Sequence, residues 1–223
     1  MTPSLTPGNV IAVVGAESTG KTELARRLAE RLTQRGIATT LVPEVLRDWC
    51  VREGRTPRPD EQAAIADEQT RRIAEAACHG VVVADTTALM TAVYSDMLFD
   101  DRALYPDALA AQAGYTMTLL TALDLPWVAD GLQRDGPHVR EPVDALVRAA
   151  LRRAGVSYGV VHGRGDERLA NAWSALHLAA AAEAPVATLR DVEWQEGWRW
   201  SCDKCSDPAC EHRLFSDLLA RRT

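Results

Sequence analysis

The sequence predicts an α/β fold in which helices wind on both faces of a five-stranded parallel sheet. Short apolar runs, each typical of a buried strand, alternate five times with helical segments. The first strand leads directly into a glycine-rich loop and a helix. The 223 residues suffice for one such domain with a core. No apolar run approaches the about 20 residues that a membrane-spanning helix needs.

The first strand and the loop after it give the strongest functional signal. Residues 10–14 are apolar throughout, as expected for a strand that is buried on both faces. The next eight residues have the spacing of a phosphate-binding loop, in which a glycine and four residues precede Gly-Lys-Thr. Such glycines let backbone N–H groups converge on an anion, and the following helix adds its positive end. We therefore predict a P-loop NTPase fold whose ATP-binding residues are Gly15, Glu17, Ser18, Thr19, Gly20, Lys21 and Thr22.

Within this loop, Lys21 is expected to reach the outer phosphates and Thr22 to bind Mg²⁺. The helix that begins at Lys21 is expected to end near Arg35, because Gly36 suits a helix C-terminus. Residues 39–42 form the predicted second strand.

Polar residues follow the second strand, at the edge of the sheet where ligands bind in parallel α/β folds. Glu44 can accept hydrogen bonds from ribose-type hydroxyls, and Arg47 lies one turn further along. Trp49 can stack on an aromatic ring or pack in the core. A solvated helix start is the alternative interpretation of this segment. Residues 53–60 form a predicted loop, and a helix is expected from Asp60, as its N-cap, to Cys78.

The third strand, residues 80–85, ends on Asp85. This carboxylate can hold Mg²⁺ or accept a proton from an attacking hydroxyl. The alternative is that Asp85 caps the next helix. We favour a functional role, because burying a charge after an apolar strand is costly unless it is used.

The second half of the chain continues the alternation. We expect a helix over 88–96, an irregular stretch around Pro106, a strand over 115–123, a helix over 142–154, a strand over 156–161 and a helix over 167–183. The loop after the fourth strand carries Trp127, Asp130 and Arg134. Arg134 is the predicted catalytic cation, which would neutralise the migrating phosphoryl group; a surface ion pair is its alternative role. Trp127 and Asp130 are predicted to shape the acceptor pocket.

The composition changes near residue 185, so we predict a P-loop domain over 8–185 and a small cysteine-rich appendage over 186–223. The appendage contains a Cys-x₂-Cys-x₄-Cys-x-His pattern, whose ligand types suit a structural Zn²⁺ site. Four unligated residues in a polar tail are the alternative. The residues of this predicted site are Cys202, Cys205, Cys210 and His212.

Several of these segments resemble the kinase module of NadR-type proteins. They are the phosphate loop, residues 43–49, residues 83–86 and, most specifically, residues 119–131. The resemblance implies transfer of the ATP γ-phosphate to the 5′-hydroxyl of nicotinamide riboside, with ATP and Mg²⁺ as cofactors. The chain departs from the family at Thr87, where the family carries a second aspartate, and in the residues after Glu44. Arg134 is also displaced by one position.

The sequence therefore favours a nicotinamide riboside kinase. A kinase for another small hydroxyl compound and a nucleotide-gated regulatory or interaction module stay open as alternatives. The net charge of −6 is mixed along the chain, so we expect a small nucleoside as the partner and neither nucleic acid nor membrane. A homo-oligomer stays open. The expected compartment is cytoplasmic, where the five cysteines would be thiols or metal ligands.

Overall fold

The computed structural model describes residues 5–128 and 137–183. Its strands are β1 (Val10–Val14), β2 (Thr39–Val42), β3 (Val81–Asp85), β4 (Met117–Thr121) and β5 (Tyr158–Val161). Its α-helices are α1 (Lys21–Gln34), α2 (Val45–Glu53), α3 (Gln62–Ala77), α4 (Ala88–Phe99), α5 (Tyr105–Ala113), α6 (Arg140–Arg153) and α7 (Gly165–Glu183). Single 3₁₀ turns, Pro59–Glu61 and Pro137–Val139, precede α3 and α6.

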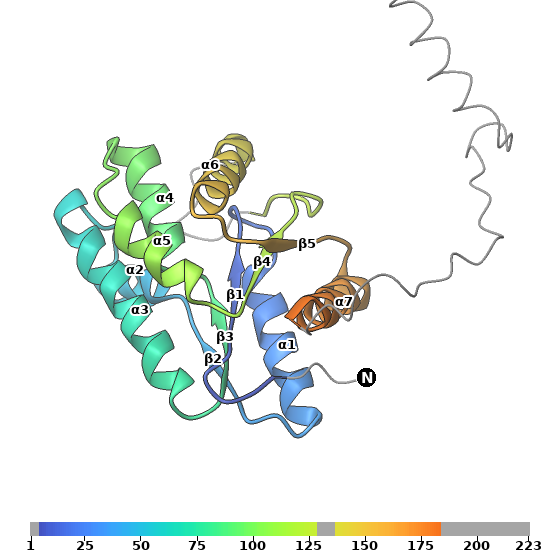
Figure 1. The fold of residues 1–223 in the computed structure, drawn as a ribbon. Coiled ribbons are helices and arrows are strands. Elements are labelled where there is room, and N and C mark those ends of the chain that lie inside the picture. The colour runs from blue at the N-terminus through green and yellow to red at the C-terminus, as the bar shows by residue number, and fades with distance from the viewer. Residues whose placement is uncertain (1–4, 129–136, 184–223) are drawn as a thin grey trace, which may run out of the picture. The chain divides into compact units, whose positions relative to one another are not determined.

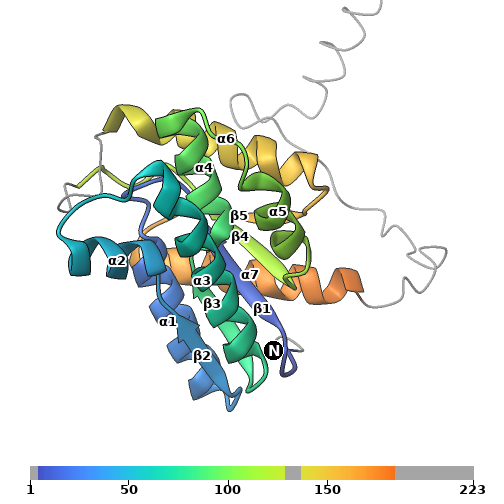
Figure 2. The ribbon, with the colours of Figure 1, turned by 90° about the vertical axis from the view of Figure 1, so that its left-hand side faces the viewer.

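The strands form one parallel sheet in the order β2-β3-β1-β4-β5, which confirms the predicted fold class. Helices α1 and α7 lie side by side on one face (Figure 1). Helices α3, α4, α5 and α6 cover the other face, as the turned view in Figure 2 shows.

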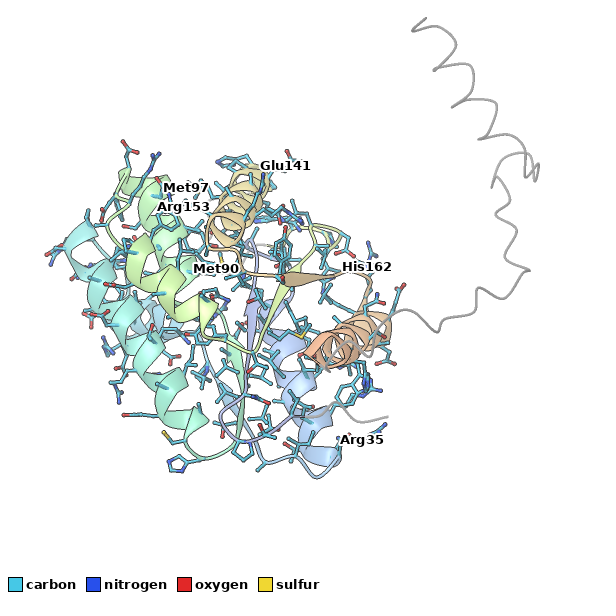
Figure 3. The ribbon with its side chains drawn as sticks, in the orientation of Figure 1. Arg35, Met90, Met97, Glu141, Arg153 and His162 are labelled. Atoms are coloured by element: carbon cyan, nitrogen blue, oxygen red, sulfur yellow. The ribbon has the colours of Figure 1, made fainter. Side chains whose placement is uncertain are left out.

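Side chains alternate along β1 and supply both halves of the core. Ile11 and Val13 pack with α1 and α7, whereas Val14 packs with α4 and α6. Both faces of the strand are therefore buried, which explains why its sequence is apolar without a break. On the second face, Met90 and Met97 of α4 fill the space toward α6 (Figure 3).

The topology brings two predicted site segments together. β1 lies between β3 and β4, and Val13 pairs in register with Asp85. Because all strands are parallel, the loop after β1 and the carboxylate that ends β3 lie at the same edge of the sheet, where ligands bind in open α/β folds.

The predicted end of α1 at Gly36 is confirmed. Gly36 has a φ of +80°, its N–H donates to the Thr33 carbonyl over 2.9 Å, and the Ile37 N–H donates to the Leu32 carbonyl over 3.1 Å. These two bonds form a Schellman motif, which satisfies carbonyls that the helix end leaves open.

Two predicted features of the helices are wrong. Asp60 is not the N-cap of α3, because a 3₁₀ turn intervenes and the helix begins at Gln62. The stretch around Pro106 is not irregular but forms α5, in which the proline occupies the first turn, where its missing N–H costs nothing. β4 and β5 are also shorter than the predicted strands. In the part of the chain that is described, no helix is both long and apolar enough to span a membrane.

Candidate nucleotide-binding and acceptor site

The loop after β1 approaches the end of β4 so closely that only glycine fits at its start. Gly15 has a φ of +146°, and a Cβ built on it would lie 2.2 Å from the Thr121 hydroxyl oxygen. Gly20, at the other end of the loop, has a φ of +74° and stands immediately before α1. These are left-handed conformations that glycine adopts without strain, and they bend the backbone into a closed loop.

Hydrogen bonds within the chain hold the loop in this shape. The Thr19 hydroxyl donates to the Ala16 carbonyl over 2.7 Å and lies 2.7 Å from the Thr121 hydroxyl. The Lys21 ammonium also donates to the Ala16 carbonyl, over 2.8 Å. Because a trans peptide is planar, fixing the Ala16 carbonyl also turns the Glu17 N–H to the opposite side. The loop is thus preorganised to present N–H groups to an anion.

Lys21 lies among charged residues from three segments. Burial lowers the pKa of its ammonium, whereas the carboxylates of Glu44 and Asp85 raise it. Arg47 is close enough to oppose them. The structure therefore brings together the loop lysine, the carboxylate after β3 and the charged pair after β2, as the sequence predicts.

Asp85 and Thr22 form a second element of the site. Asp85 is 3% exposed, and burial raises the pKa of its carboxyl, as does Glu44. A hydrogen bond from the Thr22 hydroxyl lowers that pKa, and Lys21 lowers it further. The Oδ1 atom of Asp85 has no hydrogen-bond partner among the described residues. A hydroxyl beside a carboxylate with a spare oxygen is a donor set that fits hydrated Mg²⁺.

The backbone after Asp85 is strained. Thr86 has a φ of +72°, which is an outlier for a β-branched residue, and its N–H donates to the Val13 carbonyl over 3.0 Å. Its hydroxyl is buried and has no partner within the described part of the chain. Strain of this kind concentrates at functional sites, so Thr86 adds a candidate feature to this strand end.

Thr87 occupies the position at which the NadR-type family carries a second aspartate. It is 1% exposed and is the N-cap residue of α4, so the alternative that Asp85 caps this helix is wrong. The Thr87 hydroxyl donates to the Gln112 side-chain oxygen over 2.7 Å, and the Gln112 amide donates to the Thr118 hydroxyl over 2.8 Å. At this position the chain has a buried hydrogen-bonded network in place of a charge.

The segment after β2 places Glu44 and Arg47 near Lys21 of the phosphate loop. Glu44 immediately precedes α2, and its Oε2 accepts from Arg47 Nη2 over 3.2 Å and Nε over 3.3 Å. Gln69 of α3 holds this corner, because its oxygen accepts from the Val45 N–H over 2.8 Å. The nearby Trp49 ring is covered by Arg55, whose guanidinium carbon lies 4.8 Å from the ring centroid.

The loop after β4 contacts the phosphate loop. The Ser18 hydroxyl oxygen accepts from the Val128 N–H over 2.7 Å. Trp127 is partly buried, and its indole N–H has no partner among the described residues. Asp130 and Arg134 lie outside the described residues, as do Cys202, Cys205, Cys210 and His212, so their predicted roles stay predictions.

Three polar residues near the site were given no role from the sequence, although one of them, Asp124, lies within the singled-out segment 119–131. They are Gln69, Asp124 and Arg168, and Arg168 contacts the phosphate loop directly. Gln62 and Arg140, at the starts of α3 and α6, also carry buried polar atoms without a partner in the described part of the chain. An isolated Gln, Asp or Arg on an amphipathic helix or in a loop is ordinarily a solvated residue, which is why these were missed.

Comparison with solved structures shows that the fold is similar to those of two NadR proteins and a thymidylate kinase. A NadR protein in complex with NR matches with a TM-score of 0.60 and 23% identity, over 77% of this chain and 50% of that chain. A NadR protein in complex with NAD and AMP-PNP matches with a TM-score of 0.60 and 21% identity, over 81% and 51%. Thymidylate kinase from Ehrlichia chaffeensis matches with a TM-score of 0.51 and 15% identity, over 78% and 97%.

This chain thus spans about half the length of the NadR chains it matches. At these identities the likeness shows the fold, and at that level the predicted resemblance to the NadR kinase module is confirmed. No curated protein matches the sequence. The protein family described as AAA domain matches residues 10–168, which is most of the described P-loop unit. The chain therefore belongs to this family of AAA-domain proteins.

Proposed function

We propose that this protein is an ATP-dependent kinase that phosphorylates a hydroxyl group of a small nucleoside. The observation that carries the proposal is the electrostatic grouping of Lys21 with Asp85, Glu44 and Arg47 at one edge of the sheet. A loop that only binds nucleotide needs one carboxylate for Mg²⁺, but it does not need the further charged pair of Glu44 and Arg47 beside its lysine. A phosphoryl transferase needs such charged groups to orient an acceptor and to take its proton.

In this proposal each residue has a defined task. The loop backbone and Lys21 hold the ATP phosphates. Thr22 and Asp85 hold Mg²⁺, which when bound neutralises phosphate charge. Asp85 is also the candidate general base that accepts the acceptor's hydroxyl proton. Catalysis then comes mainly from positioning and from stabilisation of charge.

The acceptor that we propose is nicotinamide riboside, phosphorylated at its 5′-hydroxyl. Two considerations support this choice. The segment over 119–131 resembles the corresponding NadR segment, and the matching NadR structure is a complex with NR. Glu44, with its side chain 11% exposed, lies beside the phosphate loop and can accept hydrogen bonds from ribose hydroxyls.

One observation favours a different nucleoside as the acceptor. Thr87 replaces a family carboxylate and is committed to Gln112, so this chain offers one negative charge fewer near a cationic base. A neutral nucleoside would not need that charge. We therefore keep a kinase for another nucleoside as the second candidate function.

The test is ADP release by the full chain with Mg²⁺ and ATP, with and without an acceptor, and with the Lys21→Ala variant as the control. Turnover that depends on nicotinamide riboside supports the first candidate. Turnover only with neutral nucleosides supports the second. If no small acceptor raises ADP release above its basal rate, the kinase proposal is wrong, and a nucleotide-gated regulatory or interaction module is favoured.

The predicted Zn²⁺ site in the appendage, residues 186–223, is a separate proposal. Its four ligand residues suit a closed tetrahedral site. Metal analysis of the purified full chain tests it: about one Zn²⁺ per chain is expected, and a metal-free chain with freely alkylated Cys202 and Cys210 contradicts it.

A further inference from the structure

Arg168 is a buried cation that the proposed chemistry does not use. It stands in the first turn of α7 and is 5% exposed. Its Nη2 donates to the Thr19 carbonyl over 2.8 Å and to the Ala122 carbonyl over 3.4 Å. Its Nη1 donates to Asp124 Oδ1 over 2.9 Å and to the Gly163 carbonyl over 2.8 Å. One guanidinium therefore joins the phosphate loop, the end of β4 and the turn after β5.

The bond to the Thr19 carbonyl affects the part of the loop whose N–H groups would bind an anion. The Thr19 carbonyl and the Gly20 N–H belong to one planar peptide and point in opposite directions. Anchoring the oxygen on Arg168 therefore fixes the direction of the Gly20 N–H, immediately before Lys21. A Cβ on Gly20 would lie 3.0 Å from Leu125 Cδ1 and 4.0 Å from Arg168 Nε, so this side of the loop is closely packed.

Asp124 compensates the buried charge and extends the contact to the turn after β5. Its Oδ2 accepts from the Gly163 N–H over 2.6 Å, while its Oδ1 accepts from Arg168. Burial alone would raise the pKa of Asp124, but these two bonds hold it below its ordinary value, so the carboxylate stays charged beside Arg168. His162, at the end of β5, lies next to this turn (Figure 3).

A second ion pair, between α1 and α7, contrasts with the contacts of Arg168. Arg27 of α1 pairs with Asp166 of α7, but the Asp166 side chain is 97% exposed and neither residue has a described bond to the phosphate loop. An exposed pair of this kind contributes little to stability. If Arg168 served only to pack α7 on α1, an exposed ion pair together with apolar contacts would be enough for that packing. A buried guanidinium with four acceptors indicates a more specific task.

We propose that Arg168 is a positioning residue for the nucleotide. Through the Thr19 carbonyl it holds the phosphate loop in its anion-binding conformation, and through Asp124 and Gly163 it couples that loop to the turn after β5. This inference rests on the proposed function, because it requires that the loop bind a nucleoside triphosphate.

The test is the Kd of Mg²⁺–ATP and of inorganic tripolyphosphate, measured by calorimetry on folded full-length chain. Arg168→Met removes the charge-assisted bonds and is expected to weaken both ligands about tenfold. Arg168→Lys keeps the charge but lacks the planar fork, so we expect a smaller loss, about threefold. Asp166→Asn is the matched control on the same helix and is expected to leave both Kd values unchanged.

The outcomes separate this inference from the proposed function. If the natural chain binds neither ligand, the proposed function fails. If it binds them and Arg168→Met binds equally well, the positioning role is wrong, even if the Tm of the variant falls. Should Arg168→Met not fold, Asp124→Asn decides: it keeps Arg168 but removes its counter-charge. An affinity for Mg²⁺–ATP about threefold weaker supports the role, and an unchanged affinity overturns it.

Discussion

The two halves of the site are built differently. On the phosphate side, short hydrogen bonds from Thr19, Lys21 and Arg168 fix the loop carbonyls, and the bonds from Thr19 and Arg168 come from buried groups. On the acceptor side, Glu44 and Arg47 are joined by bonds of 3.2 and 3.3 Å, and the Arg47 side chain is 39% exposed. We therefore expect the first half to be held more rigidly than the second.

This difference has a physical reason. A polyphosphate is the same in every reaction of this kind, so backbone groups and one lysine can be fixed in advance for it. An acceptor must enter, be oriented and leave as product. Side chains with longer bonds and partial exposure can rearrange at little cost. Changes on the phosphate side should therefore abolish function, and changes on the acceptor side should tune it.

The largest effect is expected for Lys21→Ala. Removing the ammonium takes away the only loop side chain that can place a positive charge on the outer phosphates. We expect turnover to fall by about 10²- to 10³-fold. Steady-state ADP release at saturating acceptor measures this. Turnover within a factor of two of the natural chain would contradict the assignment of the loop.

Asp85→Asn is expected to lower turnover by a similar factor, about 10²-fold, but to stabilise the ligand-free protein by about 1 kcal/mol. The sign follows from burial, which raises the pKa of this carboxyl in the folded state. The folded state then holds the proton more tightly than the unfolded state does, so the charged form costs stability once the pH rises above the unfolded pKa, about 4.

Urea unfolding of both proteins across pH checks this expectation. The gain in the free energy of unfolding for Asp85→Asn should be largest at neutral pH and should vanish as the pH falls below the unfolded pKa of Asp85. A variant that is less stable than the natural chain at pH 7 would show that this carboxylate holds the fold together instead of serving the ligand.

Gly15→Ala tests the tight contact with β4. The added Cβ would meet the Thr121 hydroxyl at 2.2 Å, and alanine disfavours the positive φ. We expect a loss of about 3 kcal/mol in the free energy of unfolding and weaker ATP binding. Gly36→Ala is the matched control, because Gly36 also has a positive φ but nothing lies within 4 Å of its Cβ position. Its ATP affinity should not change.

The sequence could predict the features that local patterns encode. The strand Val10–Val14, the loop and the end of α1 at Gly36 are local patterns, so a short window contains all the information. The sheet and its ligand edge follow from the alternation of strands and helices. Helix α5 was missed because Pro106 reads as a breaker, although a proline is well tolerated in the first helical turn.

Long-range contacts could not be predicted in this way. Arg168 bonds to a carbonyl that lies 149 positions earlier in the chain, and a backbone acceptor leaves no trace in the sequence. The role of Thr87 was likewise hidden, because its partner Gln112 belongs to the helix that was missed. A resemblance to a family identifies the absent carboxylate, but only the fold shows what replaces it.

Thr87→Val tests whether Thr87 belongs to the buried core or to the acceptor half of the site. Valine keeps the shape but leaves the buried Gln112 oxygen without its donor, which should cost about 1–3 kcal/mol in the free energy of unfolding. Because Thr87 is committed to Gln112, we expect the acceptor KM and the Kd of ATP to stay unchanged. Denaturant unfolding and steady-state kinetics measure both quantities. A raised KM with unchanged stability would show that Thr87 faces the acceptor.

Glu44→Gln is expected to change acceptor binding alone and therefore to separate the two halves most sharply. Glutamine keeps the size of the side chain but accepts hydroxyl hydrogen bonds less strongly, so the acceptor KM should rise about tenfold while the Kd of ATP stays within a factor of two. Asp48→Asn is the matched control on α2, because the exposed Asp48 pairs with the half-buried Arg72 of α3 over 3.3 Å. If Glu44→Gln weakened the binding of ATP as much as the binding of the acceptor, the two halves would act as one unit. The inference that the acceptor half adjusts independently would then be wrong.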